Sequence, residues 1–259
     1  KMPAYINTNV ASINTVRILD SSQKELTTSM ERLSSGKRIN HARDDAAGMA
    51  ISSKMTSQIN GMNQAVRNTN DGISMVQTAD GAMEGIADKL QRMRELAVQS
   101  SNGIYSSSDR AALDIEFQAL DDEINRVASS AEFNGTNLID ADAQIDIQVS
   151  YAADSTNGKI TVSLSGVDST DLGINANVIT SQAASSTAIT AVDAALSTVN
   201  SARATLGATQ NRLETTVKDL KNNVENLSAS RSRIEDADFA SETAQLAKSQ
   251  ILQQAGMAM

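Results

Sequence analysis

Hydrophobic residues between positions 189 and 234 recur at alternating intervals of three and four residues. A stripe with a mean spacing of 3.5 residues stays on one face of a helix only when other helices cover that face. At about 1.5 Å per residue, a helix over this stretch is roughly 70 Å long. The pattern therefore predicts one long helix in a bundle. Its stripe consists of Ile189, Val192, Leu196, Val199, Leu206, Leu213, Val217, Leu220, Val224, Leu227 and Ile234, interrupted by Arg203, Gln210 and Arg231.

The same spacing occurs in two stretches of the N-terminal half. The first, from Ile13 to Leu33, predicts a helix that ends at Gly36, because glycine readily adopts the left-handed conformation of a C-cap. The second, from Met55 to Val98, predicts the longest helix of the chain. Its glycines each lower helix propensity by about 1 kcal/mol relative to alanine, so bundle packing must stabilise it.

Capping signals border these helices. Asp44 or Asp45 is expected to cap the start of the longest helix, and Asn102-Gly103 to end it. The run from Ser106 to Asp109 predicts the cap of a third, shorter helix that ends before Phe133-Asn134-Gly135.

The pattern changes after Asp140. Hydrophobic and polar residues alternate over 145–149 and 160–164, with Asn157-Gly158 between them, which predicts a β-hairpin. Residues 168–187 are rich in Ser, Thr, Asp and Ala and are expected to form a loop with short strands. Beyond Ile234 the composition stays helical, but the regular stripe is lost.

The elements together predict a mainly α protein. We expect an elongated bundle of long up-and-down helices with heptad-type seams, a small β-hairpin region in the middle, and both termini at one end. Only 2% of the 259 residues are aromatic while 40% are hydrophobic, which favours thin bundles over one broad core.

Composition excludes several functions. The net charge of -9 argues against nucleic acid as a partner, and the lack of Cys excludes disulfides and thiolate metal sites. No run of about 18 apolar residues predicts a membrane span. The first residues lack the apolar core of a general secretory signal, which by itself favours a cytoplasmic protein.

Several short motifs in fixed order carry more specific information. They are ERLSSGKRIN (31–40), ARDDAAG (42–48), NDGIS (70–74), LQRMRELAVQ (90–99), FNG (133–135), LGATQNR (206–212), SRSRIEDAD (230–238) and QILQQAG (250–256). Together they closely resemble the signature of bacterial flagellins, and the resemblance covers nearly everything outside 140–186. The short insertion between the two halves resembles a minimal flagellin.

The resemblance implies a structural subunit, not an enzyme, that needs no cofactor and self-assembles into the flagellar filament for swimming motility. It implies export by the flagellar type III apparatus to the extracellular flagellum, which replaces the cytoplasmic expectation. The implied partners are other copies of the chain, the flagellar cap and junction proteins, and an export chaperone; no membrane partner is implied.

The resemblance also implies a domain organisation. The expected parts are an inner-core helix with its connector (1–43), the N-terminal half of a rod domain (44–139), a β-hairpin and loop region with a reduced variable insertion (140–186), the C-terminal long helix of the rod domain (187–236), and the incomplete start of a C-terminal inner-core helix (237–259).

Flagellins usually continue past the 250–256 motif into a final apolar helix that pairs with the N-terminal helix. This sequence stops there, so we expect the first helix to lack its main partner, and filament assembly and chaperone docking to be weakened. The residues expected in the assembly core are Leu19, Leu26, Met30, Leu33, Leu246 and Ile251.

One group of residues on the longest and third helices has two interpretations. Gln91, Arg92, Leu96, Gln99 and Glu116 resemble the flagellin surface that Toll-like receptor 5 recognises. Charged residues at such helical spacing usually form a solvated or subunit-packing face. Both readings hold if the patch is buried between subunits in the filament and exposed on the free monomer.

Other chemistry is weakly supported. A single His, His41, cannot build a metal site of several histidines within one chain. Asp121-Asp122-Glu123 and Asp140/Asp142 suggest a cation site or an acid–base pair, but a solvated face or turn is the better interpretation without the spaced ligands of a calcium loop. We therefore assign no catalytic, cofactor-binding or metal-ligating residue.

Two alternatives remain at this point. A hook-filament junction protein of the same apparatus resembles flagellin at both ends, but the dense match over 92–99 favours flagellin. A signalling rod like a chemoreceptor cytoplasmic domain would keep its seam through a helical hairpin tip, whereas a β-hairpin occupies the middle here.

Overall fold

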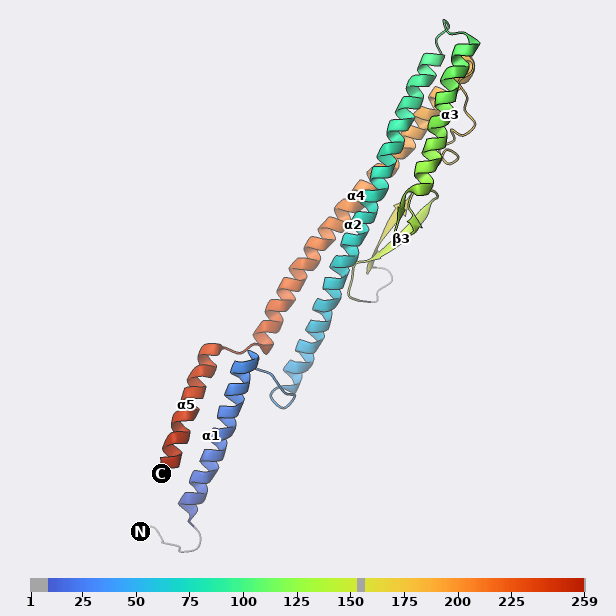
Figure 1. Ribbon diagram of the computed structural model, residues 1–259. Coiled ribbons are helices and arrows are strands. Elements are labelled where there is room, and N and C mark those ends of the chain that lie inside the picture. The colour runs from blue at the N-terminus through green and yellow to red at the C-terminus, as the bar shows by residue number, and fades with distance from the viewer. Residues whose placement is uncertain (1–8, 153–156, 259) are drawn as a thin grey trace. The chain divides into compact units, whose positions relative to one another are not determined.

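The computed structural model describes residues 9–152 and 157–258. Within these ranges the protein is mainly helical, as predicted, with two small antiparallel hairpins (Figure 1). It divides into two compact units: unit 1 comprises residues 1–60 and 223–259, and unit 2 comprises residues 61–222. The elements are α1 (Val10–Ser35), α2 (Ala46–Ser100), α3 (Ser107–Ser130), β1 (Glu132–Phe133), β2 (Thr136–Asn137), β3 (Ala143–Gln148), β4 (Lys159–Leu164), α4 (Gln182–Glu235) and α5 (Phe239–Ala258).

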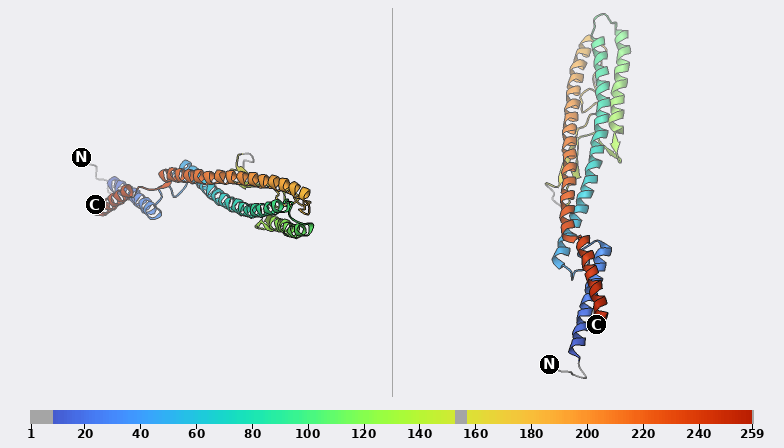
Figure 2. Two further views of the ribbon diagram at one scale, coloured as in Figure 1. Left: turned by 90° about the horizontal axis from the view of Figure 1, so that it is seen from above. Right: turned by 90° about the vertical axis from the view of Figure 1, so that its left-hand side faces the viewer.

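In unit 1, α1 and α5 pack along each other in opposite directions, so that the start of α1 and the end of α5 lie at the same end (Figures 1 and 2). The Arg32 guanidinium and the Glu242 carboxylate join the two helices by an ion pair of 3.0 Å. The first helix thus has a partner in α5, which covers one of its faces, while Ile13 and Met30 of α1 stay more than half exposed.

The C-terminal end of α1 and the start of α2 follow their predicted caps, whereas the cap at the start of α1 was not predicted. The Asn9 side chain accepts hydrogen bonds from the first turn of α1, and Gly36 ends this helix with φ 72°. Asp45 caps α2, since its Oδ1 accepts a hydrogen bond of 2.7 Å from the Gly48 N–H. Asp44 instead accepts from the amides of Asn40 and His41 and stabilises the connector.

In unit 2, α2, α3 and α4 run alongside one another around a shared apolar core (Figure 2). The predicted seams supply this core, including the fully buried Val76, Met83, Leu90, Val192 and Val199. Val98 lies near the end of α2 and is 46% exposed, so its assignment to the seam is wrong.

Two of the polar residues in the seams form ion pairs across unit 2. Arg203 on α4 donates to Asp80 on α2 at 2.8 Å and approaches Glu84 at 3.5 Å. Arg94 on α2 donates to Asp193 on α4 at 2.6 Å. These interruptions of the apolar stripe therefore have partners on the facing helix.

A reciprocal capping box starts α3. The Ser106 hydroxyl accepts from the Asp109 N–H, and the Asp109 carboxylate accepts from the Ser106 N–H. These bonds lower the pKa of Asp109 below its ordinary value, the backbone bond from Ser106 being the main cause. The predicted capping run is thus confirmed.

The predicted hairpin forms from β3 and β4, and Ile160, Val162 and Leu164 provide its buried face. The Asn157-Gly158 pair ends a longer connection, of which residues 153–156 lie outside the described part. A second, unpredicted hairpin joins β1 to β2 through Asn134 (φ 51°) and Gly135 (φ 77°). Positive φ at both positions is typical of a type I′ turn.

The segment before α4 differs from the prediction. Residues 168–181 form turns and bends without the expected short strands, and α4 begins at Gln182. Asp168 and Ser169 organise the segment through backbone hydrogen bonds to Leu172 and Ile174. Local turn bonding therefore satisfies this backbone, and no neighbouring strand is needed.

The β3–β4 hairpin lies against α2 where two glycines remove side-chain bulk. A methyl group on Gly72 would approach Ile147 at 3.1 Å, and one on Gly61 would meet Tyr151 Cβ at 2.7 Å. The Asn68 amide also donates to the Gln148 carbonyl at 3.3 Å. These glycines lower the intrinsic helix propensity of α2, but their lack of a side chain makes room for the hairpin.

We expect Gly61→Ala and Gly81→Ala, both in α2, to have opposite effects on the free energy of unfolding. Gly81 has open space around it, so alanine should stabilise by about 0.5–1 kcal/mol. At Gly61 the crowding against Tyr151 should outweigh that gain and destabilise by about 1–3 kcal/mol. Urea unfolding followed by circular dichroism measures both. Equal stabilisation by the two substitutions would contradict the conclusion that the chain packs closely against α2 at Gly61.

Candidate functional site

Arg92 is the centre of an exposed ionic cluster on α2 and α3. Its guanidinium lies 2.9 Å from Glu95 Oε2 and 2.9 Å from Glu116 Oε1. Hydrogen bonds to Glu95 first and Glu116 second raise the pKa of Arg92 above its ordinary value. Because these side chains are about half exposed, water screens the pairs and each contributes little to stability. The cluster is better suited to contacting another molecule than to stabilising the fold.

Four of the five residues predicted for this patch lie on the surface, and of these the structure brings Arg92 and Glu116 into contact. Gln91, Arg92, Gln99 and Glu116 are exposed. The Gln99 amide donates to the Tyr105 hydroxyl at 3.2 Å, which orients it at the end of α2. Leu96 does not lie on this surface: it is 1% exposed and packs in the core of unit 2. Arg92 and Leu96, four residues apart, mark the edge between the outer and inner faces of α2.

The residues predicted for the assembly core lie on α1 and α5 and are unequally covered. Leu19, Leu26, Leu33 and Leu246 are partly buried where these helices pack. Met30 and Ile251 are 56% and 65% exposed. The pairing of α1 with α5 therefore leaves some of the predicted core on the surface.

A further apolar face lies at the beginning of α1. Val10, Ile13 and Val16, which recur every three residues along one side of the helix, are each more than half exposed. Single exposed apolar residues are ordinary, but several on the first three turns of one helix favour a surface that another chain covers. The sequence pattern placed Ile13 and Val16 in the seam of this helix, but neither was among the residues expected in the assembly core.

Neither the predicted cation positions nor His41 forms a metal centre. No group of three or more His, Cys, Asp or Glu in the ranges 9–152 and 157–258 is arranged to hold a metal ion. Asp142 accepts from the Gly166 N–H, and Asp140 accepts from the Ser129 hydroxyl. His41 pairs with Glu31 at 2.7 Å. In the same part of the chain, no helix is long and apolar enough to cross a membrane.

Asp121 on α3 is unusual because it is 8% exposed and its Oδ1 has no hydrogen-bond partner. Burial raises its pKa above the ordinary value, the Ser169 hydroxyl counteracts this shift, and the nearby Asp122 and Asp168 add to it. A carboxyl group with a raised folded-state pKa favours the folded state at low pH. That contribution is lost as the pH rises through the raised pKa.

We therefore expect Asp121→Asn to stabilise the protein at neutral pH by about 1–3 kcal/mol, the usual cost of an unsatisfied buried polar group. The gain should shrink as the pH falls and Asp121 of the unmodified protein becomes protonated. Urea unfolding at several pH values measures this, with the exposed Asp122→Asn as the control. A loss of stability at neutral pH would contradict the expectation.

Two models of known protein families match most of the chain. The family model described as the bacterial flagellin N-terminal helical region matches residues 6–144. The one described as the bacterial flagellin C-terminal helical region matches residues 189–259. The chain belongs to the bacterial flagellin family. In this flagellin, the first match contains Arg92 and the exposed face of α1, and the second contains α5.

Individual flagellins agree. The chain is 45% identical over 256 residues to a flagellin of Halalkalibacterium halodurans, covering 98% of this chain and 93% of that relative. It is 46% identical over 188 residues to a flagellin of Shigella flexneri, covering 72% of this chain. The match spans about a third of the Shigella protein, 34% of its length. The Halalkalibacterium flagellin thus matches this flagellin along nearly its whole length.

Two solved structures resemble this flagellin. The crystal structure of Bacillus cereus flagellin is similar with a TM-score of 0.52 and 33% identity, covering 64% of this chain and 94% of that one. A putative flagellar hook-associated protein from Vibrio parahaemolyticus has a TM-score of 0.62 and 12% identity, covering 74% of this chain and 100% of that one. The second likeness concerns the fold alone.

Proposed function

We propose that this flagellin is a structural subunit that polymerises into the bacterial flagellar filament and thereby serves swimming motility. The observation that carries the proposal is the exposed apolar face of α1, formed by Val10, Ile13 and Val16. Packing this face against other subunits removes apolar area from water, at roughly 25 cal/mol per Å². The function is packing, and flagellins are structural proteins, not enzymes.

The proposal extends to location and partners. A filament subunit belongs to the extracellular flagellum, and we propose export through the flagellar type III apparatus. Its partners would be other copies of this chain, cap and junction proteins at the filament ends, and an export chaperone. The exposed Ile251, Leu252 and Met257 of α5 offer such a chaperone an apolar helical surface.

The alternatives have less support. A junction protein is consistent with the likeness to the hook-associated structure, but 12% identity there compares with 45% to a flagellin over nearly the full chain. A chemoreceptor-like signalling rod requires a helical hairpin in the middle of the chain. The β3–β4 hairpin stands in that place.

Polymerisation of the purified chain tests the function. Sulfate strengthens apolar burial because it is excluded from protein surfaces, so raising its concentration should drive assembly. Electron microscopy should then show long helical filaments. Small closed rings would favour the junction protein, and a chain that stays monomeric at every sulfate concentration would contradict the proposed function.

We also propose that the exposed cluster around Arg92 is recognised by Toll-like receptor 5 on the free monomer. An arginine held between two carboxylates presents its guanidinium in a fixed orientation, and arginines are frequent hot spots of interfaces. The buried Leu96 would support this surface from beneath. In a filament, packing between subunits would cover the same residues.

Arg92→Ala should raise the monomer concentration needed for half-maximal receptor signalling by about 10- to 30-fold, the effect of a typical hot spot. A cell line reporting receptor activation measures this. Arg126→Ala is the matched control, because Arg126 is also an exposed, ion-paired arginine, on α3. Equal signalling by the two variants would remove Arg92 from the proposed recognition surface.

A further inference from the structure

The two connectors of unit 1 are joined by a short stretch of antiparallel backbone pairing. Lys37 follows α1 and Asp236 follows α4, and the two residues form an isolated β-bridge. The Arg38 N–H donates to the Glu235 carbonyl at 2.7 Å, and the Ala237 N–H donates to the Gly36 carbonyl at 3.0 Å. The bridge therefore ties the end of α1 to the start of α5 across almost two hundred residues of sequence.

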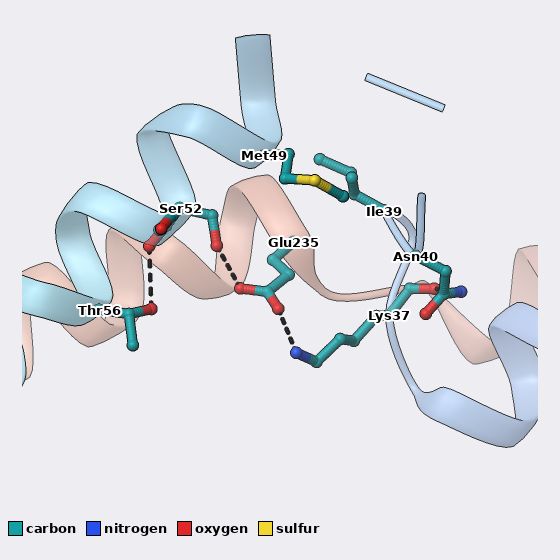
Figure 3. Close-up of a pocket in the computed structure, with 8 residues that line it drawn as sticks. Lys37, Ile39, Asn40, Met49, Ser52, Thr56 and Glu235 are labelled. Atoms are coloured by element: carbon teal, nitrogen blue, oxygen red, sulfur yellow. Dashed lines mark hydrogen bonds and ion pairs between the residues drawn. The ribbon is translucent and has the colours of Figure 1, made fainter. Parts of the chain in front are cut away.

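The Glu235 side chain reinforces this bridge by joining α4, on which it lies, to the first connector and to α2. One carboxylate oxygen forms an ion pair with Lys37 Nζ of the connector, and the other accepts a hydrogen bond from the Ser52 hydroxyl of α2 (Figure 3). The Glu235 side chain is 15% exposed but that of Lys37 is 53% exposed, so water partly screens the ion pair, whereas the hydrogen bond to the buried Ser52 is better sheltered. One carboxylate at the end of α4 thus holds the first connector and the first turns of α2.

Neighbouring groups keep this carboxylate charged. Lys37 first and Ser52 second lower the pKa of Glu235 below its ordinary value, and Arg231, one turn earlier on α4, adds to the shift. Arg231 also donates to the Thr56 hydroxyl at 3.2 Å, which joins α4 to α2 a second time. The charged groups that face Glu235 from the described neighbouring elements are thus cations.

A cavity of about 360 Å³ lies beside these groups, lined by Ile39, Asn40, Met49, Ser53 and Thr56 in addition to the three polar residues (Figure 3). The space is open to solvent and partly polar, so water can reach Lys37 and Glu235 without repacking an apolar core. The contacts of Glu235 are consequently able to break and re-form while the helices around them stay folded.

We propose that Lys37, Ser52 and Glu235 form a polar latch that is closed at neutral pH and opens in acid. In the free subunit, the latch keeps the two connectors paired. It thereby also holds together the end of α1 and the start of α5, the two helices whose apolar faces would be buried in the filament. Glu235 is in this sense a positioning residue for assembly. The role in assembly rests on the proposed function, whereas the closed latch is a property of the monomer.

The sign of the pH dependence follows from the lowered pKa. A carboxylate with a depressed folded-state pKa stabilises the closed state above its ordinary pKa. This stabilisation is lost as the pH falls through the depressed value. Protonation removes the ion pair with Lys37 and leaves a neutral carboxyl beside two cations. The bridge between the connectors should therefore loosen in acid.

Hydrogen exchange of the free monomer, read by mass spectrometry, tests the latch. In Glu235→Gln the amides of residues 36–45 and 235–239 should exchange roughly tenfold faster at neutral pH than in the unmodified protein, as expected for the loss of a charge-assisted hydrogen bond. Glu225→Gln, at an exposed glutamate of the same helix, should change nothing. Lys37→Arg keeps the cation and should retain protection within about twofold.

The pH profile separates a latch from a merely structural contact. Relative to the intrinsic exchange rate, protection of the connectors should fall in the unmodified protein as the pH drops below the ordinary pKa of glutamate and through the lowered pKa of Glu235, and should stay flat in Glu235→Gln. Connectors equally protected in both proteins, or identical pH profiles, would overturn the proposal.

Two further comparisons keep the test decisive. If Glu235→Gln unfolds throughout, Lys37→Gln removes the same ion pair from the connector side and should give the same local loosening. Loosening absent there would also overturn the latch. If the chain polymerises but neither the substitutions nor acid changes exchange at the connectors, only the latch is contradicted. If the connectors loosen in acid but the chain never polymerises, only the proposed function is contradicted.

Discussion

Replacing Phe117 by alanine should lower the free energy of unfolding by about 3–5 kcal/mol. Phe117 is fully buried on α3 and is one of only three phenylalanines in the chain. Its ring fills the core shared by α2, α3 and α4, where smaller aliphatic side chains surround it. Removing it forfeits apolar burial and leaves a cavity that rigid neighbouring helices cannot close.

Urea unfolding followed by circular dichroism measures this loss. Ile115→Ala is the matched control, because Ile115 lies two residues earlier on α3 and is 73% exposed. We expect the control to stay within about 0.5 kcal/mol of the unmodified protein. A Phe117→Ala protein as stable as the control would mean that α3 contributes little to the core of unit 2.

The second large effect concerns assembly. Ile13→Asp should abolish or strongly reduce polymerisation in sulfate while leaving the monomer folded. Ile13 is 61% exposed on α1, so a charge there is solvated in the monomer. In the polymer the same carboxylate would be buried without a partner, at a cost of several kcal/mol in every subunit. Repetition of that cost along the filament makes the effect large.

Sedimentation and electron microscopy measure the polymer, and circular dichroism verifies the monomer. Ser21→Asp adds the same charge at an exposed polar position of α1 and serves as the control. We expect the control to polymerise like the unmodified chain. Normal filaments from Ile13→Asp would show that the exposed α1 face is not an assembly surface.

The long helices were predictable because their signals are repeated many times. The stripes in α2 and α4 recur over many turns, so individual errors such as Val98 do not change the outcome. The caps at Gly36, Asp45 and Ser106 were predictable for another reason: each depends on residues within a few positions of the helix end, a left-handed glycine at Gly36 and a capping side chain at Asp45 and Ser106.

Short elements escaped prediction. The β1–β2 hairpin has strands of two residues, too short for alternation to be visible. Its Asn134-Gly135 turn carries the same Asn-Gly signal as Asn157-Gly158, but only the latter lies between visible alternating runs, so the prediction included β3 and β4 alone. An Asn-Gly pair directly after a helix deserves the same weight as one between long strands.

The candidate surfaces were only partly predictable. Resemblance placed Arg92 and Glu116 together, and the ion pair confirms that they meet. It could not distinguish Leu96 as buried, because neighbouring positions on one helix differ in which face they occupy. The latch escaped entirely: Glu235 lies in the 230–238 motif, but Ser52 is 183 residues away in sequence, and the motif alone does not reveal this partner.

The ion pair between Arg203 and Asp80 has a consequence for how α2 and α4 align. Heptad seams repeat every seven residues, so apolar packing alone would tolerate a slip of one heptad between two antiparallel helices. Such a slip would place Arg203 opposite Ile73 or Ala87, with no carboxylate at the seam to receive its charge. The pair therefore penalises misaligned helices more than it stabilises the native alignment, and together with the Arg94–Asp193 pair it selects the register in which α2 and α4 pack in unit 2.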